Sequence, residues 1–125
     1  MGMCSNSSRP RLLIADDHAI FAEALRTFLE KIYTVVGVVL DGRAMIDVVV
    51  RLRSDVVILD VAMPLLNGLE AVRRASTQAP NSKFIFLTMH DDPNLAAAAL
   101  ELGADGFVLK VSAGPGLRNA IDRLR

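Results

Sequence analysis

The chain has 125 residues, the size of one ordinary domain, and this length is enough to bury a substantial core. Its 14 basic and 14 acidic side chains cancel, so the composition lacks the basic excess typical of nucleic-acid-binding surfaces. Hydrophobic residues make up 52% of the chain, but no apolar run reaches the roughly 18 residues of a membrane span. The first residues also lack the basic-then-apolar order of a signal peptide. We therefore expect a cytoplasmic protein with no membrane contact.

The polar start of the chain, residues 1–8, predicts a disordered lead-in, and residues 9–125 are predicted to form a single domain. Cys4 is the only cysteine and lies in the lead-in. An internal disulfide and a cysteine-based zinc site are therefore both excluded.

Five short apolar runs rich in valine and isoleucine follow one another along the chain. They are continuous rather than alternating, which is typical of strands buried on both faces of a parallel sheet. The runs cover residues 11–15, 33–39, 55–59, 83–87 and 106–109.

Each run is followed by a segment in which apolar residues recur at intervals of three and four, as helices require. Phe21, Leu25 and Leu29 show this spacing after the first run. Five strand–helix pairs predict an α/β fold with right-handed crossovers. Asp92-Pro93 is a typical helix start, and Gly103 is placed to end the fourth helix.

Residues whose side chains could take part in catalysis or ligand binding follow four of the five predicted strands. Asp16 and Asp17 follow the first strand, Asp60 the third, Thr88 the fourth and Lys110 the fifth. Ligands of open α/β sheets bind outside the carboxyl ends of the strands, where the strand order reverses. If the order is 2-1-3-4-5, that point lies between the two strands that carry the carboxylates.

Taken singly, each of these residues has a simpler interpretation, such as a helix cap, a strand end or a surface lysine. Taken together, they form one set at one sheet edge. Carboxylates gathered there would repel one another unless a cation joined them, and oxygen ligands suit Mg²⁺. A carboxylate nucleophile, a metal, an ammonium group and a hydroxyl group are the parts that phosphoryl transfer needs.

The chain resembles the receiver domains of two-component response regulators, which have a flavodoxin-like (βα)5 fold. The resemblance covers about residues 9–125 and rests on several stretches with the expected spacing. The matching stretches are residues 13–18, 56–64, 67–71, 86–88 and 103–110.

The resemblance implies a role for each residue of the set. Asp60 would accept a phosphoryl group from a sensor histidine kinase, while Lys110 and Thr88 would each bind a phosphoryl oxygen. Phe107 would turn inward with Thr88 as part of the switch, unless it is only a strand aromatic. The metal ligands of Mg²⁺ would be Asp16, Asp17, Asp60 and the backbone carbonyl of Ala62.

Two histidines also lie near this set in the sequence. His90, two residues beyond Thr88, would either gate the water that hydrolyses the phosphorylated aspartate or be a solvated loop residue. His18, which follows the acidic pair, is interpreted as a residue of the first helical turn.

Within the family the sequence looks like the NarL/FixJ (LuxR-type) branch, in part because Val111 rather than proline follows Lys110. Members of that branch usually carry a C-terminal helix-turn-helix domain, so we expect a DNA-binding output domain that this chain lacks. Residues 111–116 lack the acidic residues common at this place, and Gly114 and Gly116 weaken the helix that Pro115 could open. A dimer surface on the last helix is therefore in doubt.

Other functions remain open at this point. The chain could be a stand-alone receiver or a phosphorelay intermediate, or a degenerate receiver that binds partners without phosphorylation. A haloacid-dehalogenase-like phosphatase also uses an aspartate nucleophile with Mg²⁺, but it needs a second acid where Ala62 stands. We therefore expect a signalling domain that catalyses only its own phosphorylation and dephosphorylation.

Overall fold

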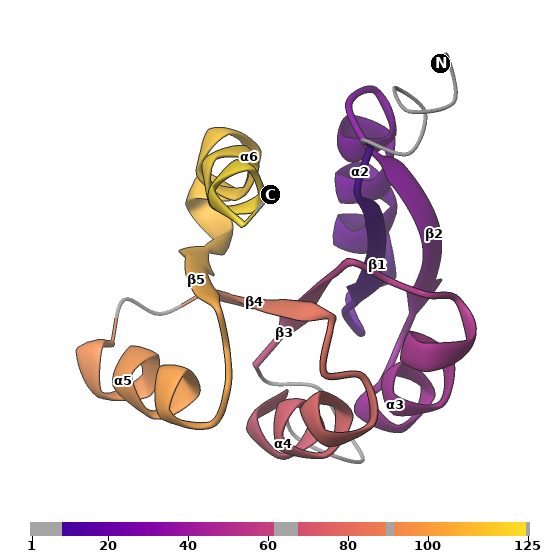
Figure 1. Ribbon diagram of the computed structural model, residues 1–125. Coiled ribbons are helices and arrows are strands. Elements are labelled where there is room, and N and C mark those ends of the chain that lie inside the picture. Colours follow the sequence, from indigo (N-terminus) through magenta and orange to yellow (C-terminus); the bar gives the residue numbers. More distant parts are fainter. Residues whose placement is uncertain (1–8, 62–67, 90–91, 125) are drawn as a thin grey trace.

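A computed structural model describes residues 9–61, 68–89 and 92–124 of the chain, and their arrangement is shown in Figure 1. Five parallel strands form one sheet in the order β2-β1-β3-β4-β5. This topology confirms the predicted flavodoxin-like order. The strands are β1 (Arg11–Ala15), β2 (Thr34–Val39), β3 (Val56–Asp60), β4 (Lys83–Thr88) and β5 (Gly106–Leu109).

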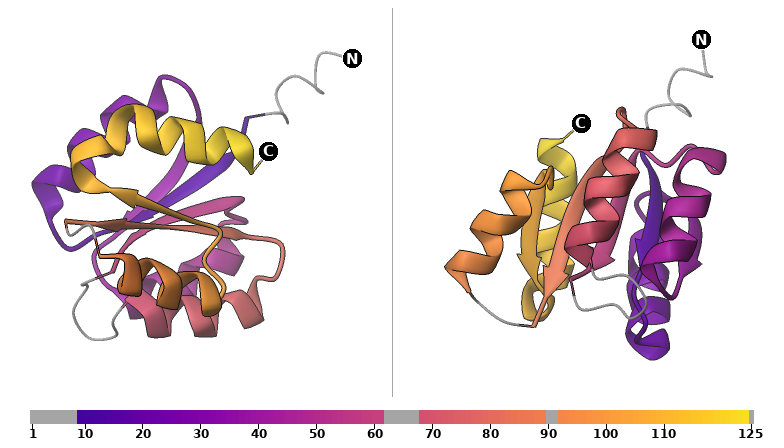
Figure 2. Two further views of the ribbon diagram at one scale, coloured as in Figure 1. Left: turned by 90° about the vertical axis from the view of Figure 1, so that its left-hand side faces the viewer. Right: turned by 90° about the horizontal axis from the view of Figure 1, so that it is seen from below.

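Five helices cover the two faces of the sheet, and a 3₁₀ turn, η1, precedes the last of them. They are α2 (Ala19–Glu30), α3 (Gly42–Arg51), α4 (Gly68–Gln78), α5 (Pro93–Glu101), η1 (Lys110–Ser112) and α6 (Ala113–Arg123). Helices α2 and α6 lie on one face, and α3, α4 and α5 lie on the other (Figure 2). None of the helices in the described part of the chain is long and apolar enough to span a membrane.

The strands contribute side chains to two separate hydrophobic clusters, because successive side chains point to opposite faces of a sheet. Leu12 and Ile14 of β1 pack with α2 and α6, whereas Leu13 and Ala15 pack with the helices of the other face. All four side chains are completely buried. This double burial explains why the strands read as continuous apolar runs rather than as alternating ones.

The predicted helix signals at both ends of α5 are confirmed. Asp92 caps the helix by accepting a hydrogen bond from the Asn94 N–H at 2.9 Å, and Pro93 is the first helical residue. Gly103, just past the helix, has a φ of 112°, which glycine adopts at little cost.

The last helix begins earlier than predicted. We expected Pro115 to open it, but α6 starts at Ala113 directly after η1. Pro115 is therefore the third helical residue. It is tolerated there because the N–H groups of the first helical turn have no partner within the helix in any case.

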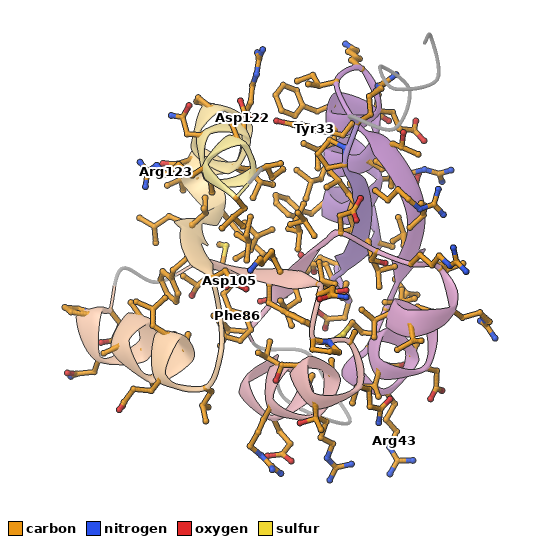
Figure 3. The ribbon with its side chains drawn as sticks, in the orientation of Figure 1. Tyr33, Arg43, Phe86, Asp105, Asp122 and Arg123 are labelled. Carbon is orange, nitrogen blue, oxygen red and sulfur yellow. The ribbon has the colours of Figure 1, made fainter. Side chains whose placement is uncertain are left out.

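A hydrogen bond ties α6 to the opposite part of the sheet, at the end away from the strand carboxyl termini. The buried Tyr33 hydroxyl donates to Asp122 Oδ1 at 2.9 Å, and Figure 3 shows the two side chains pointing toward each other. The far end of α6 is thereby fixed, so the position of its first residues beside Lys110 is also constrained.

Replacement of Ile58 by alanine tests the central position of β3. We expect the free energy of unfolding to fall by about 2–5 kcal/mol, because the change removes buried methyl groups and leaves a cavity. Urea unfolding followed by circular dichroism measures the loss. Ile20, which is 89% exposed, provides the matched control. Ile20→Ala should change the stability by less than about 0.5 kcal/mol, and equal losses for the two variants would contradict the fold.

Candidate functional site

The strand register brings the predicted site residues to one edge of the sheet. Ala15 pairs with Leu59, so the residues after them, Asp16 and Asp60, are neighbours on adjacent strands. Further along the sheet, Thr88 pairs with Leu109, the residue before Lys110. Because the strands are parallel, all of these residues lie at the carboxyl edge, as predicted.

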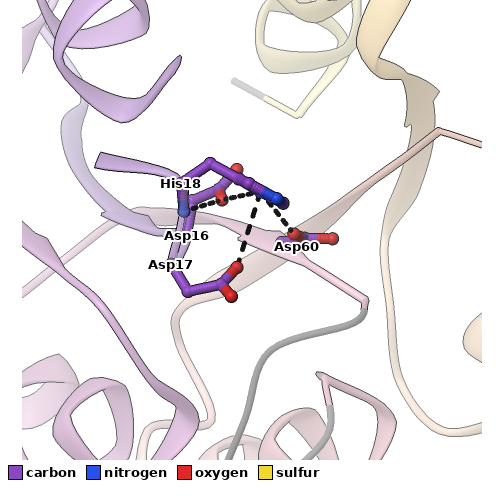
Figure 4. A group of neighbouring side chains, drawn as sticks. All are labelled: Asp16, Asp17, His18 and Asp60. Carbon is purple, nitrogen blue, oxygen red and sulfur yellow. Dashed lines mark hydrogen bonds and ion pairs between the residues drawn. The ribbon is translucent and has the colours of Figure 1, made fainter. Parts of the chain in front are cut away.

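Three carboxylates converge at this edge around the ring of His18 (Figure 4). The Nδ1 atom of His18 lies 3.1 Å from Asp16 Oδ1, 3.5 Å from Asp17 Oδ1 and 3.6 Å from Asp60 Oδ2. One ligand atom from each of the four residues lies within 4.8 Å of the others. Asp16 and Asp60 are buried, whereas Asp17 and His18 are exposed.

The chain between β1 and α2 holds this group in place by two hydrogen bonds. The Asp16 N–H donates to the carbonyl of Val39 at 3.0 Å, which continues the β1–β2 pairing by one residue. Asp16 Oδ1 then accepts the His18 N–H at 2.9 Å, as aspartate side chains commonly do two residues along in a turn. The turn directs the Asp16 carboxylate into the protein and places His18 at the start of α2.

Lys110 supplies the positive charge of the site. Its Nζ lies 2.9 Å from Asp16 Oδ2 and 3.2 Å from Asp60 Oδ2, and its side chain is only 5% exposed. The ammonium group also lies 4.6 Å from the centre of the Phe21 ring, a distance at which the ring face attracts a cation.

The residues present fit a divalent cation bound by oxygen atoms. Three carboxylates outnumber the single ammonium of Lys110, so the site keeps a negative charge. Asp16 Oδ2 is buried and accepts no hydrogen bond of normal geometry from the described residues, although Lys110 lies beside it. A buried carboxylate oxygen with spare coordination, near two further carboxylates, is what Mg²⁺ binding requires.

Thr88 and Phe107 lie at the same edge but belong to the other face of the sheet. Thr88, the last residue of β4, is buried, and Phe107 is half-buried against the cluster formed with α3, α4 and α5. By strand alternation, Asp60 and Lys110 share the face covered by α2 and α6 instead. The predicted phosphate-binding and switch residues are therefore distributed over both faces.

Ala62, a predicted metal ligand, and His90, whose role was left open, lie outside the described residues. One residue that contacts the site, His18, had been interpreted only as part of the first helical turn. The tripeptide Asp16-Asp17-His18 could have indicated this contact, because an imidazole directly after two acids is a potential third metal ligand. The actual position of the ring depends on the Asp16 turn, which the sequence pattern did not reveal.

The pKa of Lys110 is subject to opposing effects. Burial of the ammonium would lower it, but the close contact with Asp16 and the charges of Asp60 and Asp16 outweigh burial, so the pKa lies above its ordinary value of 10.5. A group whose pKa is raised by folding stabilises the protein fully below the unfolded-state pKa. That stabilisation is lost as the pH rises through the folded-state pKa.

Lys110→Met should therefore lower the free energy of unfolding by about 3 kcal/mol in Mg²⁺-free buffer, because buried carboxylates lose their cation. Urea unfolding should show this difference unchanged from about pH 7 to about pH 10 and shrinking only above that range. Lys83→Met, at the exposed start of β4, is the matched control. A difference that already shrinks near neutral pH would contradict a raised pKa for Lys110.

Comparison with known proteins places these observations in a family. A family model described as a response regulator receiver domain matches residues 12–122. The transcriptional regulatory protein DegU of Brevibacillus brevis is 34% identical over 107 residues, which are 84% of this chain and 45% of DegU. The protein CcdB of Bacillus subtilis (strain 168) is 35% identical over 101 residues, which are 80% of this chain and 84% of CcdB.

A solved structure agrees with these sequence matches. The two-component response regulator of the LuxR family from Aurantimonas sp. SI85-9A1 has a TM-score of 0.88 at 30% identity, covering 93% of this chain and 84% of that chain. The chain spans about half the length of DegU but most of the length of CcdB. From its sequence, its sheet order and these matches, the chain belongs to the response regulator receiver family, and its relatives include LuxR-type regulators.

Proposed function

We propose that this chain receives a signal by Mg²⁺-dependent transfer of a phosphoryl group to Asp60 from a phosphohistidine of a sensor histidine kinase. The observation that carries the proposal is the buried Asp60 carboxylate, which lies 3.2 Å from the Lys110 ammonium and beside the carboxylates of Asp16 and Asp17. A carboxylate oxygen of Asp60 forms the new bond to phosphorus. The phosphorus–nitrogen bond breaks, and its electron pair stays on the imidazole of the donor.

Asp16, Asp17 and Asp60, together with the backbone carbonyl of Ala62, are the residues that would hold the metal. When bound, Mg²⁺ neutralises charge that develops on the phosphoryl oxygens. Lys110 binds a phosphoryl oxygen as a point charge, and its low exposure keeps the ammonium directed at Asp60. Its present contact with Asp60 supports this role. After phosphorylation the ammonium need move only from the Asp60 carboxylate to the attached phosphoryl oxygens.

The signal is carried by Thr88 and Phe107. Phosphorylation adds about 1.5 to 2 negative charges and strong hydrogen-bond acceptors beside the end of β4. The Thr88 hydroxyl donates to one phosphoryl oxygen, and Phe107 turns into the space that Thr88 leaves. Both residues belong to the face covered by α3, α4 and α5, so the rearrangement alters the surface around β4 and β5.

Thr88 alone does not supply enough free energy to complete this switch. Shifting a two-state equilibrium from 1:99 to 99:1 requires about 5.5 kcal/mol of differential interaction. One new hydrogen bond to a charged group contributes about 1.5–3 kcal/mol. The equilibrium between the two states is therefore already biased before phosphorylation. Contacts of Lys110 and the metal with the phosphate supply the rest of the free energy.

The output is control of transcription through a DNA-binding domain that follows the receiver in the whole protein. Support comes from DegU, a transcriptional regulatory protein of which this chain spans 45%, and from the LuxR-family structure. Pairing of two receivers is a further expected step. The alternative is a receiver without DNA-binding output. The match to CcdB favours this alternative, because the matched residues make up 84% of CcdB and leave little room for a second domain.

Incubation with a small phosphodonor and Mg²⁺ tests the reaction. We expect a mass gain of one phosphoryl group that is labile, as acyl phosphates are, and that chelation of Mg²⁺ prevents. Asp60→Asn should abolish the gain, because the amide is not a nucleophile. Asp105→Asn, at an exposed aspartate before β5, is the matched control and should keep it. An unchanged gain in Asp60→Asn would contradict the assignment, and sustained release of phosphate from unrelated esters would indicate a phosphatase.

Replacement of the Thr88 hydroxyl separates phosphorylation from switching. Thr88→Ala should still be phosphorylated on Asp60, but the NMR signals of the Phe107 ring should shift much less on phosphorylation than in the native protein. Thr88→Ser keeps the hydroxyl and should restore the shift. If the alanine variant shows the full Phe107 shift, Thr88 does not transmit the signal.

A further inference from the structure

The ring of His18 occupies a position that the proposed function does not explain. Its Nδ1 faces all three carboxylates of the site at 3.1 to 3.6 Å. The same atom also lies 3.3 Å from Lys110 Nζ. His18 is the residue before α2, but its side chain makes no hydrogen bond that caps this helix. Helix capping therefore does not account for the placement of the ring.

Neither the neutral nor the protonated imidazole satisfies these contacts at once. With a proton on Nδ1, the ring donates to Asp16 Oδ1 but offers no lone pair to the N–H groups of Lys110. With the proton on Nε2, the Nδ1 lone pair accepts from Lys110 but faces the lone pairs of three carboxylates. A metal ion among these atoms removes the conflict, because it accepts lone pairs from nitrogen and from carboxylate oxygens alike.

We propose that His18 is a nitrogen ligand that allows this site to bind a divalent transition-metal ion of the Co²⁺, Ni²⁺ and Zn²⁺ class. The ligand set is His18 Nδ1 with carboxylate oxygens of Asp16, Asp17 and Asp60. The inference rests on the proposed function for the use of these carboxylates as metal ligands, but it adds a different class of ion and a further ligand.

The distances agree with such a set. Ligands about 2.1 Å from a tetrahedrally bound ion stand about 3.4 Å from one another. The three separations between His18 Nδ1 and the carboxylate oxygens, 3.1, 3.5 and 3.6 Å, bracket that value. The four ligand atoms together lie within 4.8 Å of one another, so the carboxylates must draw closer to one another when they share an ion with the ring.

Lys110 Nζ lies 3.3 Å from His18 Nδ1, so this contact must open when an ion binds. The contact of Lys110 with Asp16 need not open, because Asp16 presents a different oxygen to each neighbour. Its Oδ1 faces His18, whereas its buried Oδ2 faces Lys110. Asp60 Oδ2 is the one oxygen close to both groups, at 3.6 Å from His18 Nδ1 and 3.2 Å from Lys110 Nζ. An ion on the His18 side therefore leaves the contact between Asp16 and Lys110 in place.

Ligand chemistry determines which ions His18 favours. Mg²⁺ prefers oxygen ligands and retains much of its water, so an imidazole adds little to its binding. Imidazole is a good ligand for the later divalent transition metals, which bind nitrogen more tightly than Mg²⁺ does. The same three carboxylates are the proposed ligands of Mg²⁺. Such an ion therefore competes with Mg²⁺ for the site.

Titration calorimetry with Ni²⁺ and with Mg²⁺ at one fixed pH tests the proposal. The protein carries no affinity tag and has Cys4→Ser as the background, since a thiol also binds Ni²⁺. His18→Ala should weaken Ni²⁺ binding at least about 10-fold, as expected for loss of a ligand, and change Mg²⁺ binding less than about 3-fold. The His18 ring is 62% exposed, so the change should not disturb the core.

His90→Ala is the matched control, because these are the only two histidines of the chain. It should leave Ni²⁺ binding unchanged. The proposal is overturned if His18→Ala binds Ni²⁺ as tightly as the background, or if only His90→Ala loses affinity. Tighter Mg²⁺ binding with unchanged Ni²⁺ binding in His18→Ala would also overturn it, since the ring would then only obstruct the site. Because the readout is binding, failure of phosphorylation in the background protein would be seen separately.

Discussion

The repulsion between carboxylates at the carboxyl edge of the sheet is the constraint on which the site depends. Asp16 and Asp60 are both buried there, and Asp17 adds a third charge. Lys110 offsets part of this repulsion from a side chain that is itself almost fully buried. The remaining negative charge suits a divalent cation. The fold thus carries an unfavourable arrangement at one edge, which a bound cation would relieve.

The sheet divides the site between its two faces. Asp60 and Lys110, which would hold the phosphoryl group, share the strand alternation of the face under α2 and α6. Phe107 packs on the opposite face, and Thr88 shares its strand alternation. A change in charge at Asp60 can therefore reach the other face through the ends of two adjacent strands. The Tyr33–Asp122 hydrogen bond holds α6 at its far end.

Much of the fold and of the site could be predicted because burial on both faces leaves a strong sequence signal. The α/β class followed from strand–helix alternation, and the strand order was implied by the resemblance to receiver domains. The carboxyl edge then gathered Asp16, Asp60, Thr88 and Lys110. The predicted start of α6 was wrong. Proline disrupts a helix only beyond its first turn, so Pro115 lies inside the first turn of α6 and does not mark its first residue. The position of His18 was missed because it depends on hydrogen-bonded turn geometry rather than on periodicity.

The stability of Asp17→Asn, measured with and without Mg²⁺, tests most directly whether the carboxylates form one cation-binding unit. Asp17 is chosen because it is exposed, so its replacement leaves the buried pairs of Lys110 intact. Without Mg²⁺ the variant should unfold at higher urea concentration than the native protein, because one repelling charge is gone. Mg²⁺ at 100 times its dissociation constant should stabilise the native protein by about 2.7 kcal/mol and the variant by much less. A less stable variant that keeps the full stabilisation by Mg²⁺ would contradict the account.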